Sequence, residues 1–295
     1  MKDLHITLSD GRKLAFIEIG DPQGVPVFFF HGTPGSRKCL KEDATAFIQN
    51  GIRIIAADRP GMGMSDPQAK RSFKGWAGDV RELADYLGIE RYHVAGGSGG
   101  GPHALACGIY TSARVLSVTL ISSAAPPDVP GLSKGMSKGN RLGFFAARYL
   151  PFLLRMGFKS YAKLVKKNPD ALIHSIKKQL CPWDRAVFEK ADSEAVMEKA
   201  FIDELGEAFR QNPLYAAEDF LLVARPWNFD FTQLDMPVFL WHGEADTLMP
   251  AEPVRQLVKM IPGCDAAFIP EAGHLLLESE DVGKQILQKI IGLNV

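Results

Sequence analysis

Short, continuous runs of apolar residues recur along the chain, and each run is bounded by residues that favour turns. A strand with one solvent-facing side alternates apolar and polar residues, whereas a strand buried on both faces is apolar throughout. The continuous runs therefore predict the strands of a mostly parallel sheet at 25–30, 52–57, 92–95, 116–122, 237–241 and 266–269. Before them, alternating residues on both sides of Asp10-Gly11 predict an N-terminal antiparallel hairpin, because Asp-Gly is a common hairpin turn.

Segments with helical periodicity separate these strands, at 37–49, 73–87, 102–110, 251–260 and 275–291. Strands that alternate with helices in this way indicate an α/β fold with a doubly wound sheet. Ligands of such sheets bind at the carboxyl ends of the strands. Functional residues are therefore expected in the loops that directly follow the predicted strands.

The stretch 128–230 interrupts this alternation, because it contains helix-like segments and no convincing strand. An insertion of that length predicts a helical cap, or lid, over the carboxyl edge of an α/β core formed by 1–127 and 231–295. Residues 134–190 carry 13 Lys and Arg against 3 Asp and Glu, and residues 191–230 carry 9 Asp and Glu against 3 Lys and Arg. Either the two halves attract each other, or the basic half, rich in Phe and Leu, meets a membrane surface or an anionic acyl substrate.

The composition narrows the classes of partner. The 295 residues carry 34 basic and 34 acidic side chains, so no overall field favours nucleic acid. Four cysteines stand far apart without zinc-ligand spacing, which predicts free thiols in a reducing compartment. The N-terminus lacks the apolar core of a signal peptide, and no apolar run approaches membrane-spanning length. We therefore expect a cytoplasmic protein, without stable membrane insertion, metal or organic cofactor, whose oligomeric state is open.

The stretch 96–101 reads GGSGGG. A dinucleotide fingerprint needs glycine at positions i, i+2 and i+5, and a Walker A loop needs lysine after its last glycine; neither pattern is present. The stretch does match G-x-S-x-G between a predicted strand and a predicted helix, which is the arrangement of a nucleophile elbow. Gly96 and Gly100 would let strand and helix pass closely, with Ser98 as the nucleophile, whereas Gly97 and Gly101 have no required role.

A serine hydroxyl needs a base that takes its proton and an acid that orients the base. Asp246 follows the predicted strand 237–241, and His274 follows the strand 266–269. Together with Ser98, each lies just past the carboxyl end of a different strand, so the three side chains are expected at one edge of the sheet. The remaining histidines near strands and on the helix after Ser98 lack partners at metal spacing, and structural roles are expected for His31, His93, His103 and His242.

This set of residues, in this order, resembles the α/β-hydrolase family over essentially the full chain. The resemblance implies that Ser98 is the nucleophile, that His274 acts as general base and then acid, and that Asp246 fixes the imidazole tautomer. The segment HGTPG (31–35) is similar to the H-G-x-P-G oxyanion loop of capped members, and the backbone N–H groups of Thr33 and Gly99 are the implied oxyanion donors.

Two other acidic residues are alternatives to Asp246 as the acid of the triad, and one further motif resembles the family. Some family members place the acid after the strand that ends near 122, where this chain has Asp128, and Glu244 is a weaker rival. The D-x-x-x-P context of Asp246 fits the usual position better. The segment DRPGMGMSD (58–66) resembles the family's turn after the next strand, and we expect it to be structural.

The resemblance predicts a serine hydrolase that cleaves a carboxylic ester of a small-molecule acyl substrate through an acyl-enzyme. Catalytic efficiency should then rise with pH through the pKa of a histidine, about 6 to 7. Ser98 disfavours the epoxide hydrolase and haloalkane dehalogenase branches, which use a carboxylate nucleophile. Carbon–carbon bond hydrolases, perhydrolases and acyltransferases share the triad and stay open, and a non-catalytic ligand-sensing module is a disfavoured hypothesis.

A proline iminopeptidase-like aminopeptidase is the main alternative. Those enzymes share the H-G-x-P-G loop and a helical cap, but they usually have tryptophan after the serine, where this chain has Gly99. They also need carboxylates in the cap for the substrate amine, a role for which this chain offers Glu204, Glu207 or Glu218.

Overall fold

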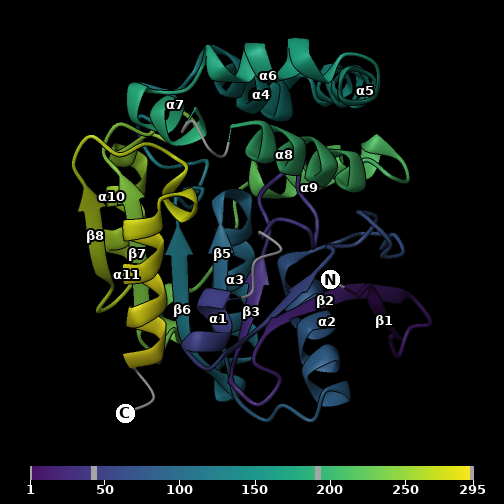
Figure 1. Ribbon diagram of the computed structural model, residues 1–295, viewed down its shortest axis with the longest axis vertical. Coiled ribbons are helices and arrows are strands. Elements are labelled where there is room, and N and C mark those ends of the chain that lie inside the picture. The colour runs from purple at the N-terminus through teal and green to yellow at the C-terminus, as the bar shows by residue number, and fades with distance from the viewer. Residues whose placement is uncertain (1, 41–44, 190–193, 293–295) are drawn as a thin grey trace.

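The computed structural model describes residues 2–40, 45–189 and 194–292. A single sheet of eight strands, in the order β1-β2-β4-β3-β5-β6-β7-β8, forms its centre (Figure 1). The β1–β2 and β2–β4 pairs are antiparallel, and the other pairs are parallel. The strands are β1 (Leu4–Thr7), β2 (Lys13–Gly20), β3 (Val25–Phe30), β4 (Ile52–Ala57), β5 (Tyr92–Gly97), β6 (Val115–Ile121), β7 (Val238–Gly243) and β8 (Asp265–Ile269).

The predicted hairpin and all six predicted core strands are confirmed, and β3 shows why the apolar runs are continuous. Phe28 and Phe30 of this strand belong to one buried hydrophobic cluster, whereas Val27 and Phe29 belong to a second cluster on the opposite face of the sheet. Both faces are therefore buried, and every position of the strand needs an apolar side chain.

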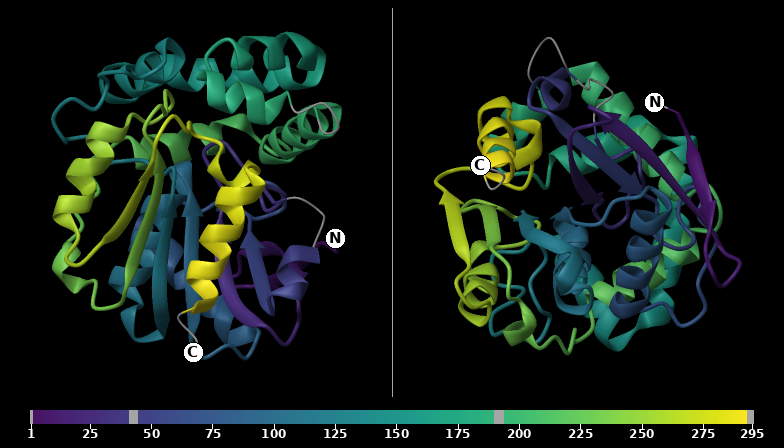
Figure 2. Two further views of the ribbon diagram at one scale, coloured as in Figure 1. Left: turned by 60° about the vertical axis from the view of Figure 1, so that its left-hand side comes forward. Right: turned by 90° about the horizontal axis from the view of Figure 1, so that it is seen from below.

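Helices cover both faces of the sheet (Figure 2). On one face lie α2, α3 and α10, which contribute to the first cluster; on the other lie α1 and α11, which contact the second. Their bounds are α1 (Thr45–Gln49), α2 (Phe73–Tyr86), α3 (Gly101–Tyr110), α10 (Ala251–Met260) and α11 (Glu280–Ile291), with short 3-10 turns η1 (Ser98–Gly100), η2 (Ser112–Arg114), η3 (Phe231–Gln233) and η4 (Leu276–Glu278).

Two predicted helices were too long. Within the predicted helix 37–49, residues 41–44 lie outside the described part of the chain. Residues 37–40 form turns and bends instead of a helix. Tertiary contacts hold this segment instead: the buried Arg37 binds Asp58 through both its backbone N–H and its guanidinium. The prediction 275–291 is split at Ser279 into η4 and α11.

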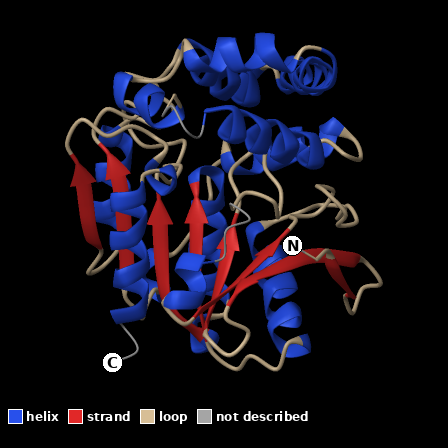
Figure 3. Ribbon diagram, viewed as in Figure 1, coloured by secondary structure: helices blue, strands red, loops and turns tan. Residues whose placement is uncertain are grey.

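Between β6 and β7 the chain forms the helical insertion, residues 138–223, beyond the carboxyl ends of the parallel strands (Figure 3). α8 and α9 lie nearer the sheet, and α4, α5 and α6 form an outer tier (Figure 1). None of the helices within the described residues is both long and apolar enough to cross a membrane. The insertion contains α4 (Lys138–Tyr149), α5 (Pro151–Lys167), α6 (Pro169–Lys177), α7 (Pro182–Phe188), α8 (Glu194–Ala208) and α9 (Pro213–Val223).

Candidate active site

Ser98 stands at the end of β5, where the strand turns directly into η1 and α3. Its φ of 52° lies in the left-handed region, which is uncommon for a residue other than glycine and often marks a functional turn. A Cβ added to Gly96 would lie 2.3 Å from the Gly100 carbonyl oxygen, and one added to Gly100 would lie 2.1 Å from the Phe30 carbonyl oxygen. The tight crossing expected at both glycines is therefore present, and it leaves Ser98 half-buried rather than enclosed.

The loop after β3 lies against this turn. A Cβ on Gly32 would lie 3.5 Å from the Ser98 Cβ, and a Cβ on Gly99 would lie 3.2 Å from the Thr33 backbone nitrogen and closer still to its side chain. Gly99 also belongs to the first turn of a helix, where backbone N–H groups have no intrahelical acceptor. The structure thus brings Thr33 and Gly99, the two residues expected to supply oxyanion N–H groups, together beside Ser98.

His274 and Asp246 form a direct pair. His274 Nδ1 lies 2.7 Å from Asp246 Oδ2, so the Nδ1–H donates to the carboxylate and leaves Nε2 as the free ring nitrogen. Asp246 Oδ1 accepts the backbone N–H groups of Leu248 at 2.8 Å and Met249 at 2.9 Å. These bonds fix the carboxylate, which in turn fixes the ring.

Electrostatics of the pair favour a charged imidazole. Burial alone would favour neutral His274, but the charge of Asp246, its hydrogen bond and the charge of Asp184 raise the His274 pKa above its ordinary 6.5. Burial alone would likewise raise the pKa of Asp246, yet the facing His274 holds that pKa below its ordinary value. Each partner stabilises the ionic form of the other.

The segment that follows β6 joins the turns of Ser98 and His274. The Ser122 hydroxyl donates to the His274 carbonyl oxygen at 2.7 Å, and the Ala124 N–H donates to the Ser98 carbonyl oxygen at 2.9 Å. Because only one residue separates Ser122 from Ala124, both turns are held against the same short segment. These backbone bonds thus hold the Ser98 turn and the His274 turn close to each other.

Asp184, from α7 of the insertion, holds the His274 loop from above. Its buried carboxylate accepts the backbone N–H of His274 at 2.9 Å and that of Leu275 at 2.8 Å. A Cβ on Gly273 would lie 2.2 Å from this carboxylate, so glycine is required there. Sequence reasoning missed Asp184, because nothing near position 184 indicates a partner 90 residues further along.

A buried ion network holds the oxyanion loop. The guanidinium of Arg59 donates to the carbonyl oxygens of His31 and Gly32 and to the Thr33 hydroxyl, which itself donates to Asp219 at 2.6 Å. Asp219 comes from α9 and pairs with Arg59 at 2.7 Å. Burial would favour the neutral acid, but Arg59 and a second arginine hold the Asp219 pKa well below its ordinary value. The structural role expected for 58–66 thus includes the support of this loop, whereas Asp219 was missed.

The other histidines have structural contacts. His31 Nδ1–H donates to the Gly32 carbonyl oxygen, and burial lowers its pKa well below 6.5. His103 Nδ1–H donates to the Gly99 carbonyl oxygen at 2.9 Å, and burial with the charge of Arg59 lowers its pKa to about 3. His93 Nδ1 contacts the hydroxyl of Ser117 at 2.7 Å.

His242 also lies close to the Asp246–His274 pair. Its Nε2–H donates to the Met249 carbonyl oxygen at 2.9 Å and lies 3.5 Å from Asp246 Oδ2. The rival acids are elsewhere: Asp128 is exposed, and Glu244 is bound to Arg255.

The three carboxylates considered for a substrate amine differ in their partners. Glu207 binds the buried Arg37 at 2.7 Å, and Glu218 binds Arg155 at 2.7 Å. Within the described residues no cation forms an ion pair with Glu204, and burial raises the pKa of Glu204 to about 8. Glu204 is therefore the one of the three whose carboxylate has no cationic partner in the described part of the chain.

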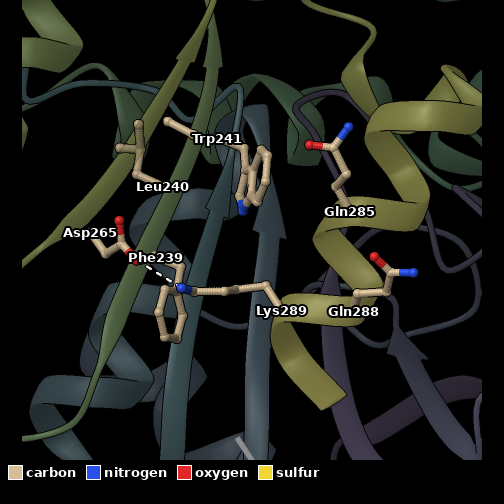
Figure 4. A pocket seen from close by; sticks show the side chains of 8 residues that line it. Phe239, Leu240, Trp241, Asp265, Gln285, Gln288 and Lys289 are labelled. Carbon is tan, nitrogen blue, oxygen red and sulfur yellow. Dashed lines mark ion pairs between the residues drawn. The ribbon is translucent and has the colours of Figure 1, made fainter. Parts of the chain in front are cut away.

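A depression between β7, β8 and α11, about 460 Å³ in volume, is lined by none of these residues (Figure 4). There Lys289 pairs with Asp265 at 2.9 Å and covers the Phe239 ring. It holds no histidine or serine, and we assign it no catalytic role. Across the described part of the chain, no group of three or more His, Cys, Asp or Glu is placed to hold a metal ion.

A mostly parallel eight-stranded sheet with a serine on a strained strand-to-helix turn, and an acid and a histidine on later loops, defines a class of α/β hydrolytic enzymes. The sequence profile of the alpha/beta hydrolase fold matches residues 25–281. The chain therefore belongs to the α/β-hydrolase family.

Known relatives within this family have several activities. The chain is 25% identical to a proline iminopeptidase of Xylella fastidiosa, over 94% of this chain and 92% of that protein. It is 32% identical to 3-oxoadipate enol-lactonase 1 of Acinetobacter baylyi, where the match spans 42% of this chain and only about half, 48%, of the relative. Among solved structures, a hydrolase from Pseudomonas aeruginosa PA01 has a TM-score of 0.71 at 18% identity, covering 99% and 98% of the two chains, which shows the shared fold.

Proposed function

We propose that this protein is a serine hydrolase that cleaves a carboxylic ester of a small-molecule acyl substrate, with Ser98, His274 and Asp246 as its catalytic triad. The observation that carries the proposal is the 2.7 Å pair between His274 Nδ1 and Asp246 Oδ2, held to the same segment as the strained Ser98 turn. A buried carboxylate on Nδ1 assigns the ring proton to that nitrogen, so Nε2 is the base.

The proposed reaction has two acyl-transfer steps. His274 Nε2 takes the proton of Ser98 while Oγ bonds to the ester carbonyl carbon, and the oxygen anion of the tetrahedral intermediate accepts hydrogen bonds from the Thr33 and Gly99 N–H groups. The carbon–oxygen bond to the alcohol breaks as the imidazolium returns its proton to that oxygen. Water repeats the sequence on the acyl-enzyme, which releases the acid and restores Ser98.

The ester preference draws support from related proteins. The relatives include a bifunctional esterase/perhydrolase from Acinetobacter calcoaceticus as well as the enol-lactonase, and the solved structures with this fold include an esterase from Rhodococcus. Lactones and esters require the same acyl transfer from oxygen. We infer that the insertion acts as a cap over the substrate, since Asp184 and Asp219 join it to both loops of the site.

A second candidate, an aminopeptidase, is favoured by one observation. Glu204 Oε1 lies 3.0 Å from where a Cβ on Gly35 would stand, so an unpaired carboxylate borders the oxyanion loop. A substrate ammonium there would replace the missing counter-ion and lower the pKa of the carboxylate.

A panel of substrates separates the candidates. We expect hydrolysis of p-nitrophenyl acetate and butyrate, absent from Ser98→Ala, and little turnover of prolyl p-nitroanilide. An aminopeptidase would instead prefer the free-amine anilide over its N-acetyl form, and Glu204→Gln would remove that preference while ester turnover persists. Ester hydrolysis by Ser98→Ala at the wild-type rate would disprove the serine mechanism for either candidate.

A further inference from the structure

An exposed apolar surface lies on the outer tier of the insertion, which we call the α4–α5 face. Seven of the twelve large apolar side chains that the described residues expose fall within 15 residues of sequence. Phe152 and Leu142 are each 67% exposed. Single exposed apolar residues are ordinary, but a concentration of this kind marks an interaction surface. The face consists of Leu142, Phe145, Tyr149, Leu150, Phe152, Leu153 and Met156.

The face is built on helices whose opposite sides are already packed. α5 buries Leu154, Phe158 and Ala162 in the core of the insertion, while Phe152, Leu153 and Met156 point away from it. α4 buries Ala146 and Ala147 in the same way. The outer tier lies on the side of the insertion remote from the sheet (Figures 1 and 2). The exposed side chains therefore contribute neither to the core nor to the candidate active site.

The segment that carries the face has only positively charged side chains. Residues 129–169 contain nine Lys and Arg and no Asp or Glu. Of the nine, and as far as the described residues show, only Arg155 forms an ion pair, with Glu218 of α9. Ion pairs between the two halves of the insertion therefore neutralise little of this positive charge. The exposed members are Lys134, Lys138, Arg141, Arg148, Lys159, Lys163, Lys166 and Lys167.

We propose that the α4–α5 face docks on the surface of a lipid bilayer that contains anionic lipids. Large apolar and aromatic side chains enter the boundary between headgroups and acyl chains, and the surrounding cations bind lipid phosphates. The helices lie on the membrane and do not span it. The orientation would hold the catalytic core above the bilayer, with the insertion between them.

Charge and chemistry favour this occupant over two others. A second copy of the chain, docked through the same face, would bring two sets of nine positive charges together without an acidic residue on either side of 129–169. Nucleic acid binds cations through its phosphates, but its backbone offers no apolar phase for seven large apolar side chains. An anionic bilayer satisfies both features at once.

Vesicle flotation tests the proposal with the full-length wild-type chain. We expect it to float with phosphatidylcholine vesicles that contain about 30% phosphatidylglycerol and to stay unbound with phosphatidylcholine alone. Phe145→Ser with Phe152→Ser, and separately Arg148→Gln with Lys159→Gln and Lys163→Gln, should each lower the partition coefficient at least about tenfold. The charge variant should also show a weaker salt dependence than wild type.

Exposed apolar residues outside the α4–α5 face supply matched controls. Tyr86→Ser and Met260→Ser remove exposed apolar groups from α2 and α10 and should bind vesicles as wild type does. Circular dichroism and ester turnover of every variant show that the fold persists.

Absence of wild-type flotation, equal binding to both vesicles, or unchanged binding by both α4–α5 variants would overturn the proposal. So would a dimer that dissociates in the Phe variant, or nucleic acid binding without vesicle binding. The binding assay does not depend on the proposed triad.

Discussion

Asp246→Asn tests the proposed triad through the hydrogen bonds of the Asp246 carboxylate. Asp246 Oδ1 accepts two backbone N–H groups, a task that an asparagine carbonyl oxygen still performs. The NH₂ group of the asparagine would then face His274 Nδ1. In the wild-type structure, Asp246 Oδ2 occupies this place, 2.7 Å from Nδ1. An NH₂ group can only donate, so the ring proton would move to Nε2. The nitrogen that should accept the Ser98 proton would be blocked.

The expected loss follows from the missing charge. With an effective dielectric constant of about 20, an ion pair with charge centres ~4 Å apart gains about 4 kcal/mol, or about three powers of ten in rate. The tautomer change adds to this, and comparable substitutions in serine proteases lower turnover about 10⁴-fold. We therefore expect kcat/KM for p-nitrophenyl butyrate to fall about 10³- to 10⁴-fold, with unfolding temperature nearly unchanged.

The rival acid supplies the matched control. Asp128→Asn alters an exposed carboxylate of the same type and should leave kcat/KM within about twofold of wild type, as is usual for surface substitutions. The two variants are to be assayed in parallel across pH 5 to 9. A loss smaller than about tenfold in Asp246→Asn, or a large loss in Asp128→Asn, would refute the assignment of the acid.

Three other predictions concern the same site. Because the His274 pKa is raised and the neutral ring is the base, kcat/KM should rise with pH through a midpoint above 6.5, and a flat pH profile would contradict this. Asp184→Asn removes one of the charges that raise this pKa, so the midpoint should move to lower pH, whereas Asp203→Asn on an exposed part of α8 should not move it. Gly101→Ala places a Cβ 1.9 Å from Ser123 Oγ and should lower the free energy of unfolding by about 1–3 kcal/mol, while Gly97→Ala, with its nearest contact at 3.7 Å, should change it by less than about 0.5 kcal/mol in urea titrations.

The sheet was predictable because each core strand carries its own signal. β3 and β4 are apolar at nearly every position, since both faces are buried, and the predicted bounds agree with the structure. The elbow was predictable for a similar reason: the Gly96 and Gly100 requirements arise within a few residues of Ser98. Gly101 was given no role, because the Ser123 side chain that requires it comes from the next strand's loop.

The supports of the site depend on contacts between distant segments. Asp184 and Asp219 are acidic residues within the helices α7 and α9, and an acidic residue normally faces solvent. Their partners, the His274 backbone and Arg59, lie 90 and 160 residues away along the chain. The helix predicted at 37–49 was too long at a segment of the same kind, where the buried Arg37 binds Asp58, 21 residues away along the chain.

Covalent labelling by a fluorophosphonate probe tests the central claim most directly. The probe reports a serine that an adjacent base has activated, and intact-protein and peptide mass spectrometry locate the adduct. We predict one adduct per wild-type chain, on the peptide that contains Ser98, no adduct on Ser98→Ala, and normal labelling of Ser160→Ala, which alters an exposed serine on α5. Wild type that stays unlabelled, or Ser98→Ala that labels as fast as wild type, would contradict the account.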